Sequence, residues 1–217
     1  MPRVVGHGLS ISLDGYMAGA NQSMQHPLGM GGERLHEWAF ATRSMRELHG
    51  MEGGEAGLDD DWARRSVDGI GATIMGRNMF GPVRGPWPDE TWRGWWGDDP
   101  PFHHPVFVLT HHARQTLEMA GGTTFTFVTG GIEEALRQAR AAAGDLDVRV
   151  GGGPATIQQY LEVGLIDELH VVVVPTLLGQ GERLFAGSLE SLPERYECAE
   201  FQASARALHV LLVRTSA

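Results

Sequence analysis

Cysteine is almost absent from this chain of 217 residues, with Cys198 as the only one. A single cysteine cannot form a disulfide within the chain, a composition typical of proteins from a reducing cytoplasm. The spacings that mark zinc sites are missing too, because no HExxH or CxxC pattern accompanies the histidine pairs His103/His104 and His111/His112. Adjacent residues on extended backbone point to opposite faces, so each pair supplies at most one ligand to a site. We therefore expect no metal site.

Long apolar runs are absent as well. None approaches the ~20 consecutive residues that a membrane-spanning helix needs. Met1, Pro2 and Arg3 lead directly into a strand pattern, without the apolar segment of a secretory signal. We therefore expect no membrane partner and a cytoplasmic location.

Positive charge is scarce. The chain has 17 Lys and Arg residues against 27 Asp and Glu, for a formal net charge of −10. A negative field of this size repels phosphate backbones, so nucleic acid is not an expected partner. An anionic cofactor would have to be held by local groups against the overall charge.

The remaining composition is that of a globular protein, with 42% hydrophobic and 20% charged residues, no repeats and no linker-like segment. We therefore expect one domain over residues 1–217. Hydrophobic periodicity predicts strands at residues 4–12, 72–75, 105–109, 123–129, 147–150 and 168–175, with two antiparallel strands within 196–214. It predicts helices at residues 33–49, 59–67 with Asp59 as the cap, 132–143, and after Gly76 and Gly153. Such alternation indicates an α/β fold: a mainly parallel sheet with antiparallel C-terminal strands and helices on both faces.

The segment VGGGPATIQQYL contains the most informative local pattern. Gly151, Gly152 and Gly153 end a predicted strand, and Pro154 suits the first turn of a helix. Glycines at such a turn let backbone N–H groups approach an anion, and the start of the helix adds partial positive charge. A diphosphate would suit such a site, whereas the alternative is that the glycines only permit tight packing between strand and helix.

Two further predicted strands end in anion-binding chemistry. The strand at 72–75 runs into Gly76, Arg77 and Asn78, and the strand at 105–109 runs into Thr110 and His111. The carboxyl ends of parallel strands meet at one edge of a sheet, and three such ends together favour a nucleotide-binding crevice. For Arg77 the alternative is an ion pair with one of the many carboxylates.

These motifs resemble, in order, those of the dihydrofolate reductase superfamily. The similar segments are SLDGYMAG (12–19), IMGRNMF (74–80), VFVLTHHAR (106–114), GGGPATIQQYL (151–161) and LIDELHVVVVPTLLGQGERLF (165–185). Within the superfamily the chain looks most like the reductase domain of the bifunctional riboflavin-biosynthesis deaminase–reductase and its stand-alone relatives.

The resemblance implies an NADPH-dependent reductase. It assigns the adenosine 2′-phosphate to Arg77, Thr110 and His111. It places the rest of the cofactor on Gly76, Asn78, Gly151, Gly152, Gly153, Pro154, Ala155, Thr156 and Ile157. The implied reaction is hydride transfer to a small heterocyclic carbonyl or imine, most like 5-amino-6-(5-phosphoribosylamino)uracil. Dihydrofolate or pteridine reduction and a non-catalytic NADP-binding role are the alternatives.

On the substrate side, the helix that begins near Glu33 matches the helix that holds a pterin-binding carboxylate in dihydrofolate reductases. Matching Leu35 and Trp38 to its apolar positions puts Arg34 where that carboxylate is expected. Arg34 and Trp38 are therefore candidate substrate contacts, and folate is not the expected substrate. The alternatives are that Glu33 takes the carboxylate role, or that these charges only form a solvated helix face.

Two features stay open between functional and structural roles. Asp14 follows the first strand beside the expected nicotinamide position, so it either orders a proton-donating water or only shapes an Asp-Gly turn. The segment 81–105 contains Trp87, Trp92, Trp95 and Trp96, whose aromatic surface suits a pocket rim or a subunit contact. We expect both uses, in a homodimer like those of relatives of the riboflavin-reductase type.

Overall fold

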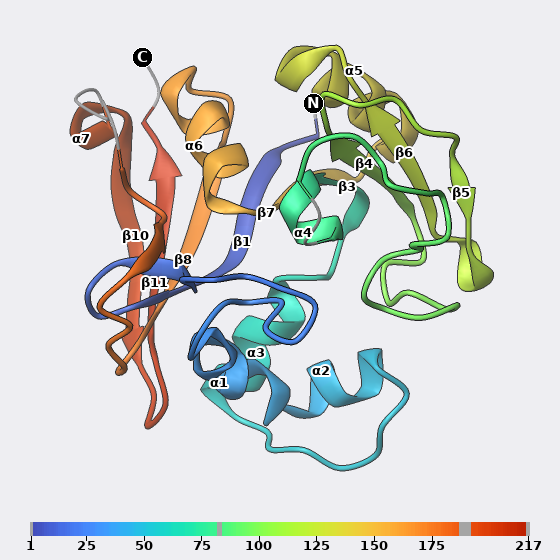
Figure 1. The fold of residues 1–217 in the computed structure, drawn as a ribbon. Helices are drawn as coiled ribbons and strands as arrows, with labels where there is room; N and C mark the ends of the chain where they lie inside the picture. The colour runs from blue at the N-terminus through green and yellow to red at the C-terminus, as the bar shows by residue number, and fades with distance from the viewer. Residues whose placement is uncertain (1, 82–83, 187–191, 216–217) are drawn as a thin grey trace.

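The fold is built on one long twisted sheet, shown in Figure 1. The computed structural model describes residues 2–81, 84–186 and 192–215. Its nine-stranded sheet has the order β10-β11-β8-β1-β7-β3-β4-β6-β5. The parallel strands are β8 (Glu168–Val174), β1 (Val4–Ser12), β7 (Asp147–Gly152), β3 (Ile70–Gly76), β4 (Pro105–Leu109) and β6 (Thr124–Val128). The antiparallel strands are β10 (Tyr196–Ala203) and β11 (Leu208–Arg214) at one edge and β5 (Leu117–Glu118) at the other.

This arrangement confirms the predicted α/β class, with a mainly parallel sheet and antiparallel C-terminal strands. The sequence pattern did not reveal β5, nor the small second sheet formed by β2 (Tyr16–Gly19) and β9 (Gly181–Arg183). These strands are too short to produce a clear alternation of apolar and polar residues.

One face of the sheet is covered by α5 (Gly131–Ala143) and α6 (Pro154–Glu162). Alternate residues of the central strands, such as Val148, Val150 and Ile74, pack against these helices. Because side chains alternate across a strand, Arg149 and Thr73 belong to the opposite face.

The opposite face carries two separate hydrophobic clusters. Toward β8 and β11 it is covered by α1 (Glu37–Phe40) and α3 (Leu58–Arg65), with Trp38 and Trp62 in the core. Toward β4 and β6, Phe80 and the tryptophan-rich segment pack on Val106, Val108 and Phe125. The middle strands between the two clusters carry polar residues on this face, among them Arg149 and Thr73.

Two helix predictions were wrong in detail. The expected helix at 33–49 is three pieces: a 3-10 turn η1 (Gly32–His36), α1, and α2 (Arg43–Leu48). The break comes at Thr42, whose extended backbone and Oγ1, accepting from Met45 N at 3.3 Å, start a new helix. Asp59 is not a cap, because α3 already begins at Leu58 after Gly57 and the Asp59 carboxylate instead accepts from His209.

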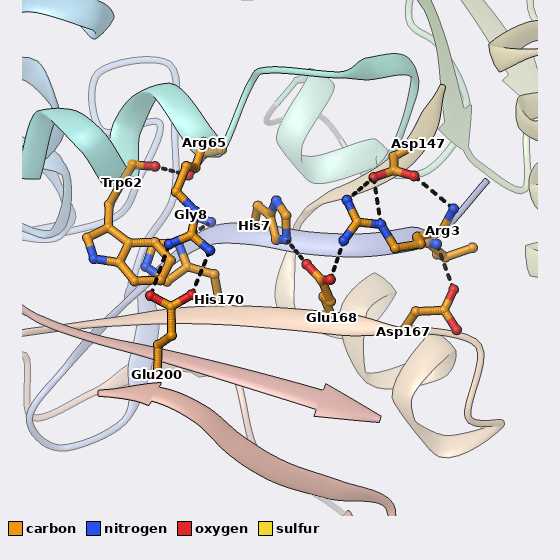
Figure 2. A network of polar contacts seen from close by, with 12 residues as sticks. Arg3, His7, Gly8, Trp62, Arg65, Asp147, Asp167, Glu168, His170 and Glu200 are labelled. Carbon is orange, nitrogen blue, oxygen red and sulfur yellow. Dashed lines mark hydrogen bonds and ion pairs between the residues drawn. The ribbon is translucent and has the colours of Figure 1, made fainter. Parts of the chain in front are cut away.

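Polar contacts join the start of β1 to both neighbouring strands, as Figure 2 shows. Arg3 binds Asp147 at the start of β7, with Nη2 to Oδ2 at 2.6 Å, and Glu168 at the start of β8. Asp167 accepts from the Val4 amide at 2.8 Å. These contacts fix the order of the central strands at their amino ends, and they use three of the chain's many carboxylates.

A chain of buried polar groups lies beneath α3. Asp59 contacts His209 Nε2 at 2.8 Å, His209 Nδ1 contacts His170 Nε2 at 3.1 Å, and His170 Nδ1 accepts from Gly8 N at 3.3 Å. His170 is stacked on Trp62 with ring centroids 4.2 Å apart. Burial, followed by the proximity of His209, lowers the pKa of His170 far below its ordinary value. The folded protein therefore keeps this imidazole neutral.

The described part of the chain contains no helix that is long and apolar enough to cross a membrane.

We predict that acid destabilises the fold through these histidines. As the pH drops below about 6.5, the unfolded chain binds protons that the folded cluster excludes, so the free energy of unfolding decreases. For one histidine the slope reaches about 1.4 kcal/mol per pH unit until the folded pKa is reached. Urea unfolding at a series of pH values should show this decline. His170→Leu should flatten it whatever its effect on absolute stability, whereas the exposed His26→Gln should not. An equal slope in wild type and His170→Leu would contradict the prediction.

Candidate functional site

A cavity of about 330 Å³ opens at the carboxyl ends of β3, β4, β6 and β7. Its lining comes from segments far apart in the sequence: Gly76, Arg77, Asn78, Arg84, Gly85, Leu109, Thr110, His111, His112, Thr129, Gly131, Gly153, Pro154, Ala155, Thr156, Gln159 and Glu182. The three strand ends that the sequence marked as anion-binding therefore meet at one place.

Two glycines allow the β3 end and the start of α6 to come together. A Cβ on Gly76 would lie 2.4 Å from Thr156 Oγ1 and 3.4 Å from Gly153 N, so any side chain here would push α6 away. Gly153 differs, because a Cβ there would meet nothing within 4 Å and its φ is −81°. Gly153 is also the residue before the first turn of α6, and no side chain caps that helix. The space beside Gly153 is thus open to a ligand at a helix N-terminus.

Arg77 is the principal cation of the cavity. Its guanidinium is stacked over the Trp87 ring, 3.2 Å from the ring centroid, and Nη1 donates to the Gly85 carbonyl at 2.9 Å. Its Nε and Nη2 are buried and have no hydrogen-bond partner within the described residues. Burial, with a smaller contribution from Arg114, lowers the pKa of Arg77. Unpaired donors on a buried cation are costly, so this group is suited to bind an anion.

A second arginine increases the positive charge near Trp87. The Arg114 guanidinium lies 4.8 Å from the Trp87 ring centroid, and Nη2 donates to the carbonyls of Glu90 and Trp92 at 2.7 and 2.5 Å. Arg77 binds only an uncharged partner, whereas the carboxylates of Glu90 and Asp89 lie near Arg114. Arg77 thus contributes positive charge to the cavity in a chain of net charge −10. Among the described residues that line the cavity, the one carboxylate is that of Glu182, and it pairs with Arg84 at 2.9 Å.

The end of β4 completes the rim. Thr110 is buried and its Oγ1 accepts from His112 N at 3.1 Å, which holds the turn after the strand. His111 is exposed and lines the cavity. These positions fit the predicted phosphate contacts, although no ligand contact tests them.

Most of the predicted cofactor residues line this cavity. The exceptions are Gly151, Gly152 and Ile157. Ile157 is fully buried and its N–H donates to the Gly153 carbonyl at 3.2 Å, so it secures the start of α6. The sequence reading missed Thr129 and Gln159. Thr129 ends a strand that had been predicted, so its place at the sheet edge could have been inferred.

Asp14 lies outside this cavity and joins two loops. Its carboxylate accepts from Ser12 Oγ at 2.5 Å, Leu178 N at 3.1 Å and Gly179 N at 2.7 Å. The Ser12 hydrogen bond, with those from Gly179 and Leu178, lowers the pKa of Asp14 to about 2. It therefore carries no proton at neutral pH. Its predicted part in ordering a proton-donating water stays a prediction.

The two candidate substrate residues lie in different surroundings. Arg34 is exposed on η1, as is Glu33. Trp38 is only 3% exposed, and its indole N–H donates to Ser10 Oγ at 2.9 Å across the sheet face. Their substrate roles also stay predictions.

The tryptophan-rich segment serves mainly to pack the protein. Trp87 donates to the His112 carbonyl at 2.9 Å and Trp92 to the Phe80 carbonyl at 3.0 Å. Trp95 and Trp96 line a separate cleft beside α2. Residues 82 and 83 of this segment lie outside the described residues. The pocket-rim and subunit-contact expectations for this segment both stay predictions.

Comparison with known proteins gives one family match. The sequence pattern of the RibD C-terminal domain matches residues 4–210. No curated protein sequence matches the chain.

Solved structures with this fold include three that cover nearly the whole chain. One is a protein assigned to riboflavin biosynthesis from Shewanella sp. PV-4, with a TM-score of 0.62, 21% identity and 100% of both chains covered. Another is the diaminohydroxyphosphoribosylaminopyrimidine deaminase/5-amino-6-(5-phosphoribosylamino)uracil reductase of Thermotoga maritima, with a TM-score of 0.55 and 15% identity. This chain spans 57% of that protein's length. A third is dihydrofolate reductase from Enterococcus faecalis complexed with NADP(H), with a TM-score of 0.51, 11% identity, and 99% of this chain and 97% of that chain covered. These likenesses establish a dihydrofolate reductase-like fold.

We predict opposite consequences for side chains at the two glycines of the cavity. Gly153→Val should keep a near-wild-type unfolding temperature, since its side chain enters open space, but should abolish measurable NADPH binding. Gly76→Val should destabilise the fold itself, by about 1–3 kcal/mol, because its side chain overpacks the contact with Thr156. Thermal unfolding and NADPH titration of both variants check this. A folded Gly153→Val protein with wild-type NADPH affinity would show that the glycine turn serves packing alone.

Proposed function

Because the chain belongs to the RibD C-terminal domain family, we propose that it is an NADPH-dependent reductase acting on a phosphoribosylated aminouracil or a close heterocyclic relative. Membership of this family of reductase domains makes the chain an oxidoreductase. The cofactor and the substrate are the parts that we propose.

The observation that carries the cofactor assignment is the state of Arg77. Two of its side-chain nitrogens are buried donors without a hydrogen-bond partner among the described residues. Arg77 lines the cavity, and the absence of a side chain at Gly153 leaves space there for a ligand. A phosphate monoester such as the NADPH 2′-phosphate supplies acceptors for both donors, and guanidinium groups suit this geometry. NADH lacks that phosphate.

The other residues of the cavity have distinct tasks in this proposal. Gly153 gives the diphosphate room beside the start of α6, whose dipole favours negative charge, and Gly76 lets the end of β3 approach that helix. Thr110 and His111 supply polar groups at the end of β4. The bound cofactor supplies a hydride. The protein holds the reacting partners at a fixed geometry and excludes water.

Family membership supports an aminouracil substrate over dihydrofolate. The Thermotoga maritima protein is named for that activity, whereas the dihydrofolate reductase likeness is one of fold. The helix region that would hold a pterin-binding carboxylate offers the exposed Glu33 and Arg34 and the buried Trp38. The described residues of this helix region therefore include no buried carboxylate.

The test combines cofactor choice with turnover. Wild type should bind NADPH at least about tenfold more tightly than NADH, about 1.4 kcal/mol from one charge-assisted contact. Arg77→Ala should remove most of that preference and leave NADH affinity nearly unchanged, while the exposed Arg140→Ala should change neither. NADPH oxidation should occur with the phosphoribosylaminouracil and be weak or absent with dihydrofolate.

Equal affinity for NADPH and NADH in wild type would refute the 2′-phosphate assignment. Robust dihydrofolate reduction at micromolar substrate would instead assign the pterin-binding role to Glu33. NADPH binding without turnover of any candidate would favour a non-catalytic sensor or scaffold.

We also propose a homodimer in the cytoplasm. The edge strand β10 exposes Phe201 to 66%, and the loop after β8 exposes Leu177 to 69% beside Leu13 at 62%. An open sheet edge and apolar side chains of this kind favour association of two copies. The exposed thiol of Cys198 fits a reducing compartment.

Light scattering at micromolar concentration should therefore give about twice the 23.6 kDa chain mass. Phe201→Glu should shift the mass toward the monomer, because it places a charge on the proposed contact. The exposed Leu146→Glu, between α5 and β7, is the control. A clean wild-type monomer would exclude the dimer.

A further inference from the structure

A further cleft begins at the amino ends of β3 and β7, where the end of α5 borders it, and extends over the opposite face of the sheet. It has a volume of about 600 Å³ and lies between α2 and the tryptophan-rich segment. Its lining includes His49, Gly71, Met79, Trp96, His104 and Arg149. The cleft falls in the gap between the two hydrophobic clusters of this face, so apolar packing does not fill it.

Arg149 is the unusual residue of this cleft. It lies on β7 in register with Val5 of β1 and Thr73 of β3, so it comes from the middle of the sheet. Its side chain has no hydrogen bond or ion pair to any described residue, and its Nε is fully buried. Other described arginines without a side-chain partner, namely Arg34, Arg43 and Arg140, are exposed and solvated by water.

The surroundings leave the positive charge of Arg149 uncompensated. Burial lowers its pKa to about 10, so it remains charged at neutral pH. His104 carries no charge at neutral pH, because burial, reinforced by Arg149, lowers its pKa to about 4. Glu168 is already engaged by Arg3 and His7 (Figure 2). Asp68 lines the cleft but is exposed and forms no ion pair with Arg149.

Neutral polar groups come from the strand next to Arg149 and from His104 in the cleft lining. Thr73 lies on the neighbouring strand in register with Arg149, and its Oγ1 contacts His104 Nε2 at 2.8 Å. A hydroxyl and a neutral imidazole next to an arginine are the side chains that complete a phosphate site. A buried cation without such a ligand is strongly unfavourable.

Met79 lies between the cleft and the glycine turn of the cofactor cavity. Gly151 is two residues beyond Arg149 on the same face of β7, about 7 Å along the strand. A Cβ on Gly151 would lie 3.5 Å from Thr73 Cγ2 and 3.7 Å from Met79 Cε, and Met79 lines the cleft. A small molecule in this cleft would therefore have one end near the turn that separates the two cavities and the other near Arg149.

We propose that Arg149, with Thr73 and His104, forms the site for the phosphate monoester of the substrate. The inference rests on the proposed function, which it deepens by giving the substrate phosphate its own cation, distinct from Arg77. Arg149 is a specificity residue in this proposal and takes no part in hydride transfer. Discrimination against the dephosphorylated substrate follows, since its binding leaves the half-buried guanidinium unpaired.

The experiment compares the phosphoribosylaminouracil with its dephosphorylated ribosyl form, by NADPH oxidation. Wild type should favour the phosphorylated form in kcat/KM. Arg149→Met, which keeps an unbranched side chain but removes the charge, should reduce that preference by about tenfold or more, through KM rather than kcat. Arg149→Lys should keep part of the preference, and the exposed Arg140→Met should keep all of it. An unchanged ratio in Arg149→Met, or no preference in wild type, would overturn the proposal.

Two binding measurements separate this inference from the proposed function. With saturating NADPH present, ribose 5-phosphate should raise the unfolding temperature of wild type and of Arg140→Met but not of Arg149→Met. NADPH affinity should be the same in all three. Stabilisation by ribose 5-phosphate without turnover of any aminouracil would keep the anion site and reject the reaction. If Arg149→Met instead loses its preference for NADPH over NADH, Arg149 serves the cofactor and the proposal is wrong. Should Arg149→Met not fold, Arg149→Lys decides through the same ratio and the same thermal shift.

Discussion

The close contact between the end of β3 and the start of α6 is the constraint on which the candidate site depends. Gly76 has no Cβ, so Thr156 and the Gly153 amide can approach it to distances that no side chain would allow. This contact sets the separation of β3 and β7 at their carboxyl ends. The cavity that collects Arg77, Thr110 and the glycine turn exists because those ends are held so close.

Charge distribution is the second organising feature. The protein is acidic overall, yet its two most important cavities each contain a half-buried arginine with buried, unpaired nitrogen, Arg77 and Arg149. Several carboxylates are engaged by other arginines: Asp147 and Glu168 hold Arg3, and Glu200 holds Arg65 over Trp62 (Figure 2). Local pairing at the strand starts and at the surface thus leaves positive charge where anionic ligands are expected.

The two faces of the sheet divide stability from chemistry. The α5 and α6 face is filled by the apolar residues of alternate strand positions. The opposite face carries Arg149, Thr73, His170 and Ser10 at the intervening positions, and there the packing is interrupted by a cleft and a buried histidine chain. Because side chains alternate along a strand, β7 contributes Val148 and Val150 to the packed face and Arg149 to the opposite face.

The sequence by itself determined the order of strands and helices, the parallel sheet and the three strand ends that meet in one cavity, because periodicity and glycine turns are local signals. It could not determine the break of the 33–49 helix at Thr42, the pairing of Asp59 with His209, or the tether that Asp14 forms with the Leu178–Gly179 backbone. Those depend on partners up to 165 residues away. Arg149 gave no signal in the sequence, since a charged residue in an alternating strand is typical of a solvated face. Only the tertiary structure decided that its neighbours bury it without a partner, because burial depends on what the rest of the chain places above the sheet.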